Sequence, residues 1–131
     1  ENKIGIDYAL AGTLCIHQCY FEHNSEHEIY IHDTGISRVL VTLEKSFILH
    51  TFSESYDSVI KQDASSNRTV FYVINNNYIR LQSSEYNGNF INVISGSLTI
   101  EARNNFIIGD PYPICSTAPL ETSYFNNDFS V

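Results

Sequence analysis

Cysteine and histidine gather near the start of the chain, and both are ligands that zinc and copper prefer. Cys15, His17 and Cys19 follow the two-residue period of a strand, which would place them on one face. Neighbours in such a row lie about 6.6 Å apart, too far for all three to converge on one ion. We therefore expect no metal or other cofactor, and a strand whose cysteines face the core.

The three cysteines leave an odd number for disulfide pairing. Along a regular strand Cys15 and Cys19 would lie about 13 Å apart, whereas a disulfide requires Cα atoms within about 7 Å. These two are therefore predicted not to pair with each other. Either one could pair with Cys115, or all three could be reduced and buried.

Acidic side chains that could act as general acids or bases occur without a spacing that specifies catalysis. The candidates are Asp33, Glu44, Asp57, Asp63, Glu85 and Glu101. The sequence contains no Gly-x-Ser-x-Gly turn, phosphate-binding glycine loop or His-Glu-x-x-His helix. We expect a protein that is not an enzyme.

Composition excludes several classes of partner. The 131 residues carry 7 Lys and Arg against 15 Asp and Glu, a formal net charge of −8, which argues against nucleic-acid binding and a polybasic membrane surface. Hydrophobic residues make up 43%, which argues against disorder. No apolar run approaches the roughly 20 residues of a membrane span. We expect one β domain over residues 1–131.

Two features favour an extracellular or cell-surface location. The sequence contains no methionine, even at position 1, which indicates a processed chain or a fragment. The triplet Asn67-Arg68-Thr69 is an acceptor for N-glycosylation. Together with the cysteines, these features predict a secreted protein with a glycan on Asn67.

Strand signals dominate the chain, and no segment shows a helical period. The expected strands are Lys3–Asp7, Leu14–Phe21, Glu28–His32, Val39–Leu43, Phe47–Thr51, Ser58–Lys61, Val70–Ile74, Tyr78–Gln82, Phe90–Ile94, Leu98–Glu101, Phe106–Ile108 and Ser123–Phe125. A spacing of about ten residues is typical of a sandwich or a barrel. Asn87-Gly88 predicts a tight hairpin joining Tyr78–Gln82 to Phe90–Ile94, and Ser95-Gly96 predicts a second turn.

The segments Val70–Ile74, Tyr78–Ile91 and Gly96–Ile100 together look like one lobe of a β-trefoil. They resemble the arabinose-binding module of fungal arabinofuranosidases, in which a Phe-x-Val strand precedes a hairpin with Ser-x-x-Tyr-Pro-Gly. Interleukin-type trefoil cytokines have a similar hairpin. The resemblance covers about residues 46–103, and Asn87 stands where the family has proline. It implies a β-trefoil of about twelve short strands; the alternative is an antiparallel β-sandwich, immunoglobulin-like or jelly roll.

The resemblance also implies a sugar site. Ser46–Phe52 is similar to the strand that carries the family's sugar-binding histidine, and His50 matches that histidine. The family's aspartate corresponds to Asn67, or to Asp63 if the loop shifts. Tyr56 or Tyr86 would form a stacking wall at the mouth of the pocket. The alternative for His50 is a buried or sheet-edge residue with a structural role.

The expected function is a noncatalytic, lectin-like module that binds carbohydrate. Tyrosine, asparagine, aspartate and histidine are abundant, and such side chains stack on sugars or bond their hydroxyl groups. The alternative is a protein-binding or structural subunit: a cytokine-like ligand, an adhesin or pilus subunit, or a viral surface protein. In that case residues 123–131 could lie on the chain's own sheet, or could pair with a neighbour's sheet edge and form a homo-oligomer.

Overall fold

The chain winds repeatedly through three sheets, and each sheet receives every third strand. The computed structural model describes residues 3–9, 12–22, 24–32, 38–52, 58–64, 68–83, 89–109, 112–116, 120–125 and 128–130. Sheet A contains β1 (Ile4–Tyr8), β4 (His27–His32), β7 (Ser58–Asp63), β10 (Asn89–Ser95) and β13 (Tyr112–Ser116). Sheet B contains β2 (Gly12–His17), β5 (Val39–Glu44), β8 (Thr69–Asn75), β11 (Ser97–Arg103) and β14 (Leu120–Phe125). Sheet C contains β3 (Tyr20–Glu22), β6 (Phe47–Phe52), β9 (Tyr78–Ser83), β12 (Phe106–Ile108) and β15 (Asp128–Ser130).

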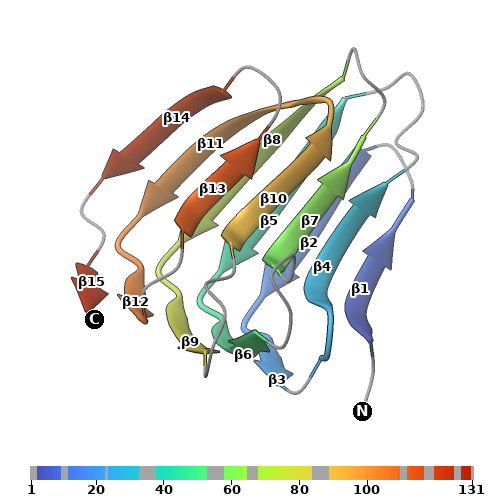
Figure 1. Cartoon of the computed structure of the whole chain (residues 1–131). Coiled ribbons are helices and arrows are strands. Elements are labelled where there is room, and N and C mark those ends of the chain that lie inside the picture. Colours follow the sequence, from blue (N-terminus) through green and yellow to red (C-terminus); the bar gives the residue numbers. More distant parts are fainter. Residues whose placement is uncertain are drawn as a thin grey trace.

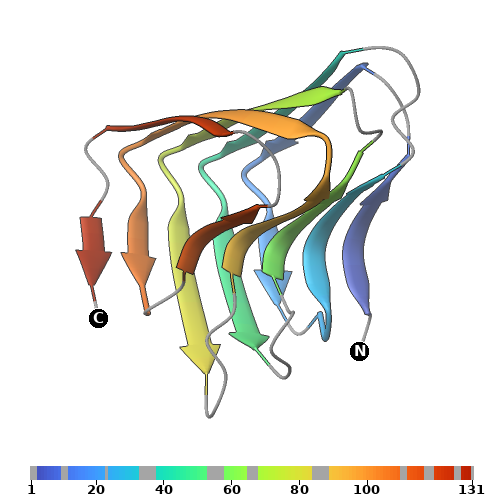
Figure 2. The same cartoon turned by 45° about the horizontal axis from the view of Figure 1, so that its top comes forward.

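Every pair of neighbouring strands is parallel. One turn of the chain supplies one strand to each sheet, and the next turn lies directly beside it (Figure 1). The strands β1 and β13 lie at opposite edges of sheet A. Figure 2 shows the three sheets as three sides of one solenoid. This arrangement is a parallel β-helix.

The expected trefoil, and the alternative antiparallel sandwich, are wrong. Both folds are built from antiparallel pairs, whereas the strands here pair in parallel. The all-β character is confirmed: no helix occurs in the described residues. The misleading signal was the alternation of buried and exposed residues, which usually marks antiparallel sheets. In a β-helix each parallel sheet also has one face in the core and one in solvent, so its strands alternate too.

The expected hairpin between Tyr78–Gln82 and Phe90–Ile94 is also absent. β9 lies in sheet C and pairs with β6 and β12, whereas β10 lies in sheet A and pairs with β7 and β13. Asn87 and Gly88 themselves lie outside the described residues. Gly96, with a φ of 81°, does lie at a turn, but that turn is a corner from sheet A to sheet B.

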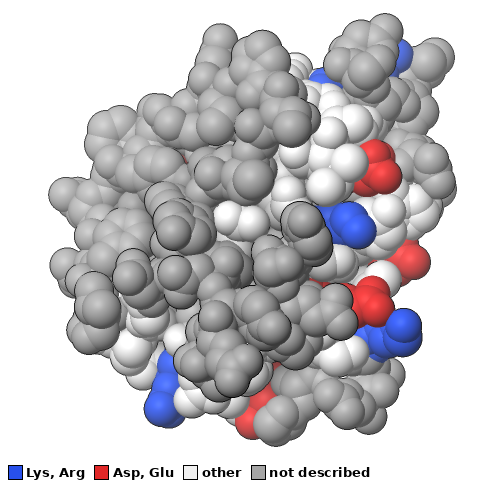
Figure 3. All heavy atoms as spheres, in the orientation of Figure 1, with Lys and Arg blue, Asp and Glu red and all other residues white. Residues whose placement is uncertain are grey.

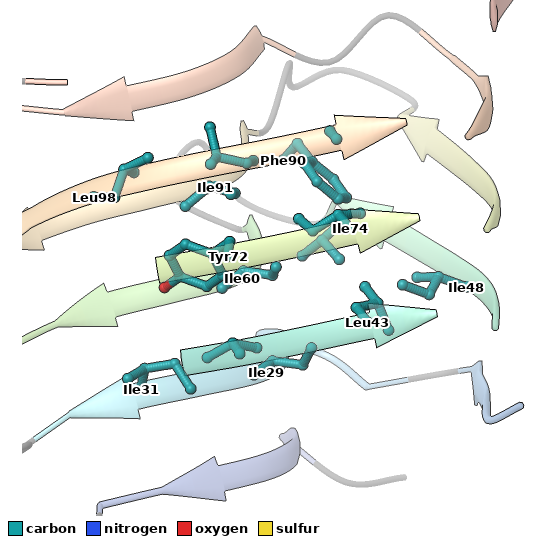
Figure 4. Close-up of a cluster of buried hydrophobic side chains, with 14 of the residues drawn as sticks. Ile29, Ile31, Leu43, Ile48, Ile60, Tyr72, Ile74, Phe90, Ile91 and Leu98 are labelled. Atoms are coloured by element: carbon teal, nitrogen blue, oxygen red, sulfur yellow. The ribbon is translucent and has the colours of Figure 1, made fainter. Parts of the chain in front are cut away.

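The core between the three sheets is one connected cluster of mainly apolar side chains. Equivalent positions of successive turns stack in rows: Ile29, Ile60 and Ile91 lie in register on β4, β7 and β10. Figure 4 shows these side chains facing Leu43 and Ile74 across the interior. Isoleucine and valine pack well at such positions because their branched side chains suit a pleated surface.

The corner from sheet B to sheet C repeats almost unchanged in four turns. One residue in each corner has a positive φ between 49° and 58°: Gln18, Lys45, Asn76 and Asn104. In the last two of these corners the next residue is an asparagine, and its side chain points along the solenoid. Asn77 donates to the Leu43 carbonyl oxygen at 2.8 Å and to Asn105 Oδ1 at 2.9 Å, and Asn105 donates to the Ile74 carbonyl oxygen at 2.7 Å. This asparagine ladder satisfies buried backbone groups that the corner removes from the sheets.

Candidate functional site

The outer face of sheet A carries a row of polar side chains across neighbouring turns. Asp7, Tyr30, Lys61 and Asn92 occupy equivalent positions on β1, β4, β7 and β10. They face outward because they alternate with core-facing residues of the same strands. The Asp7 side chain is 59% exposed, Tyr30 and Lys61 are half-buried, and Asn92 is buried. The parallel register therefore aligns groups that are distant in sequence.

A second row lies beside the first. His32 and Asp63 are in register, as are Asp63 and Ser95. The Ser95 hydroxyl lies 2.7 Å from Asp63 Oδ1 and also within hydrogen-bonding distance of the Ala64 carbonyl oxygen. We call Asp7, Tyr30, His32, Lys61, Asp63 and Ser95 the sheet A polar surface.

Contacts within the sheet A polar surface orient its groups. His32 Nε2 is hydrogen-bonded to Asp7 Oδ1. The His32 ring also stacks on the Tyr30 ring, with 4.5 Å between centroids. Lys61 Nζ lies 5.1 Å from the centroid of the Tyr30 ring, within the range of a cation–π contact. Two carboxylates, an ammonium and an imidazole thus lie on one face.

The charges on this side of the molecule are mixed. Figure 3 shows acidic and basic side chains interspersed among uncharged atoms on the face toward the viewer. The arrangement offers both hydrogen-bond donors and hydrogen-bond acceptors to a polar ligand.

A second polar cluster is enclosed in the interior. His50 Nδ1 lies 2.8 Å from Glu28 Oε1, and both side chains are 0% exposed. Asn24 Nδ2 donates to the other oxygen of Glu28. Within the described part of the chain, His50 Nε2 has no hydrogen-bond partner. A ligand in solvent cannot reach this pair, so its role is structural: Glu28 compensates the cost of burying the imidazole.

Two of the residues expected to bind sugar lie in the described part of the chain, and these two do not form one site. His50 lies in the interior on β6, not at the mouth of a pocket. Asp63 ends β7 and belongs to the sheet A polar surface. Asn67, Tyr56 and Tyr86 lie outside the described residues.

The expected strand Leu14–Phe21 is broken at Gln18, where φ is 54°. Cys15 lies on β2 in sheet B, and Cys19 follows the corner before β3. Cys15 and His17 therefore share the outer face of β2, whereas Cys19 does not lie on that strand. Cys15 and Cys19 are free and exposed, so the prediction that they face the core is wrong. No group of three potential metal ligands occurs in the described residues.

An aromatic stripe runs along the outside of sheet C. Tyr20, Phe47, Tyr78 and Phe106 are in register, with successive ring centroids 5.0, 5.0 and 5.4 Å apart. Tyr20 is 61% exposed, Phe106 39% and Tyr78 37%. The Tyr20 hydroxyl donates to Glu22 Oε2 at 2.9 Å, and this bond raises the pKa of the phenol.

Our sequence reasoning missed this repeat, although a signal for it exists. Each stripe residue follows a corner pair and precedes a buried Phe or Ile, as in Asn76-Asn77-Tyr78-Ile79 and Asn104-Asn105-Phe106-Ile107. The aromatic positions recur at intervals of 27, 31 and 28 residues. Such recurrence is the signature of a solenoid.

A pocket lies on the outside of sheet B, where its first two strands begin. Gly12, Thr13, Arg38 and Leu40 line it, and its volume is about 280 Å³. Arg38 is exposed, and its guanidinium carbon lies 4.1 Å from the centroid of the Phe71 ring. This stacking holds a cation at the edge of the pocket.

The described residues contain no helix that is long and apolar enough to cross a membrane. Comparison with protein-family models, curated proteins and solved structures gave no match. Function must therefore be inferred from the surfaces of this chain.

Proposed function

We propose that this chain is a noncatalytic carbohydrate-binding module that acts outside the cell or at its surface, and that it binds an extended glycan across sheet A. The observation that carries the proposal is the alignment of the sheet A polar surface across successive turns. Parallel strands lie about 4.7–4.9 Å apart, which is comparable to the length of one sugar ring in an extended chain. Each turn can therefore meet one sugar.

The side chains suit hydroxyl groups. Lys61 donates hydrogen bonds, the carboxylate of Asp63 accepts them, and His32 is held in place by Asp7. Tyr30 does not stack on the sugar, because its ring already contacts His32 and Lys61. It orients the two polar groups that contact the ligand.

The test begins with a glycan array and continues by calorimetry with the best ligand at increasing chain length. Affinity should rise with each added sugar up to the number of turns that the surface spans, because successive sugars meet successive turns. Lys61→Ala should weaken binding by about tenfold, the effect of losing one hydrogen bond to a charged group. Arg80→Ala, a cation on the outside of sheet C, is the matched control and should bind like the parent.

Two results would overturn the proposal. One is the absence of binding to any glycan tested. The other is a loss of affinity with Arg80→Ala as large as that with Lys61→Ala, which would show that the glycan does not bind specifically to sheet A. Mass spectrometry of the protein from a secreting eukaryotic cell tests the expected glycan on Asn67 separately.

The aromatic stripe favours a second candidate function, protein binding. Its rings cover one another's faces, so mainly ring edges point outward and little flat surface is free to stack on a sugar. Exposed aromatic side chains are instead enriched at protein interfaces. Sedimentation of the parent and of Tyr78→Ser tests self-association: a concentration-dependent oligomer that Tyr78→Ser dissolves would support a subunit role.

A further inference from the structure

We propose that the pocket on sheet B is a binding site for a carboxylate-bearing small ligand, with Arg38 as the anion-binding residue. The proposal concerns a different sheet from the sheet A polar surface and does not rest on it. The pocket volume of about 280 Å³ lies at the lower limit of ligand sites in proteins. It admits one small group, such as a single sugar ring.

The guanidinium of Arg38 is held in position by an aromatic ring. One face stacks on Phe71 at 4.1 Å, which limits the rotamers available to a long side chain. In the described part of the chain no carboxylate pairs with Arg38, whereas Arg103 on the same sheet pairs with Glu101 at 3.0 Å. Stacking occupies a face of the guanidinium and not its in-plane N–H groups, whose fork geometry matches the two oxygens of a carboxylate.

The rest of the pocket adds space and one hydroxyl. Gly12 has a φ of 118°, and its nitrogen donates to the Arg38 carbonyl oxygen at 3.1 Å, which fixes the backbone beside the guanidinium. Among the described residues, the one atom that a Cβ on Gly12 would approach is the Tyr8 hydroxyl, at 3.8 Å. The pocket floor is therefore open above Gly12. The exposed Thr13 supplies a hydroxyl that can bond a second polar group of the ligand.

An anion site is notable in a chain with a net charge of −8. The overall field repels anions, so binding must come from local contacts. Because the attraction is local and partly exposed to solvent, binding should weaken at high salt.

The experiment is an NMR titration of the full chain with three probes: glucuronate, glucose and propanoate. Glucose has the ring without the carboxylate, and propanoate has the carboxylate without the ring. We expect glucuronate to shift the amide signals of Gly12, Thr13 and Leu40, and glucose to bind at least tenfold more weakly. Propanoate separates the two sources of a carboxylate: if it binds as tightly as glucuronate, the ligand is a simple organic acid, and if it binds more weakly, the ligand is a sugar acid.

Variants assign the effect to Arg38. Arg38→Ala should weaken glucuronate binding by tenfold or more. Arg38→Lys keeps the charge but loses the planar fork, and should fall between Arg38→Ala and the parent. Arg103→Ala is the control on the same sheet and should bind like the parent. Equal affinity for glucose and glucuronate, absence of binding by both acids, or unchanged binding in a folded Arg38→Ala variant would each overturn the proposal.

Discussion

The asparagine ladder makes a quantitative prediction about stability. Asn77 is 3% exposed, and its side chain connects three turns of the solenoid. Its Oδ1 accepts from the Ser46 backbone N–H at 2.9 Å, and its Nδ2 donates to the Leu43 carbonyl oxygen at 2.8 Å and to Asn105 Oδ1 at 2.9 Å. Asn77→Ala removes all three bonds.

The expected loss follows from the groups that remain. After Asn77→Ala, the Ser46 N–H and the Leu43 carbonyl are buried without their partner. Each unsatisfied buried group costs about 1–3 kcal/mol, so the free energy of unfolding should fall by about 2–6 kcal/mol. A typical domain is stable by only about 5–15 kcal/mol, so this is a large fraction of the total.

Urea unfolding followed by circular dichroism measures the loss. Asn75→Ala is the matched control, because Asn75 Oδ1 accepts from the Arg103 backbone N–H in an exposed setting, at 3.1 Å. Solvent replaces that partner, so its loss should be at most about 1 kcal/mol. Equal losses for the two variants would refute the reasoning that Asn77 is a buried connector between turns.

Three further predictions concern the interior. His50→Ala leaves the buried Glu28 carboxylate without its partner and should destabilise the fold by about 3–5 kcal/mol in urea; an unchanged unfolding midpoint would contradict the enclosed pair. Gly96→Ala should lower the melting temperature, because φ is 81° and a Cβ would lie 2.9 Å from a carbonyl oxygen. The expected loss in the free energy of unfolding is about 1–3 kcal/mol. An unchanged melting temperature would argue against the corner between β10 and β11. Burial raises the pKa of the Tyr72 phenol, so the unfolded chain releases this proton first and stability should fall as the pH rises above about 10. Tyr72→Phe removes the 3.0 Å hydrogen bond to Gln62 Oε1 and should lower the free energy of unfolding by about 1 kcal/mol at neutral pH. Between about pH 9 and 11 this variant should lose less stability than the parent. Urea unfolding at rising pH tests this, and an equal loss in the two proteins would contradict it.

Much of the local structure is readable from the sequence. The expected strands Val39–Leu43, Val70–Ile74 and Leu98–Glu101 lie within β5, β8 and β11. Their alternate residues face the core, as the two-residue period predicts. Strand formation depends on neighbouring residues, so a local pattern is enough to find it.

The direction of strand pairing cannot be read in this way. Tyr78–Gln82 and Phe90–Ile94 look like the arms of a hairpin, but each pairs with strands from other turns. An alternating strand has the same pattern whether its neighbours run parallel or antiparallel. A regular sequence repeat would have indicated parallel pairing between turns. Here the repeat is irregular, because the aromatic positions are unequally spaced and the residues with positive φ at the corners are of different types.

By itself, then, the sequence determined that the chain is built of strands, and for most of them where they lie and which residues face inward. Only the tertiary structure decided which residues meet. Parallel register brought Asp63 beside His32 and Ser95 on an outer face, whereas it enclosed His50 with Glu28 in the core. The physical reason is that strand formation is local, whereas the register of a solenoid depends on packing between turns more than 20 residues apart.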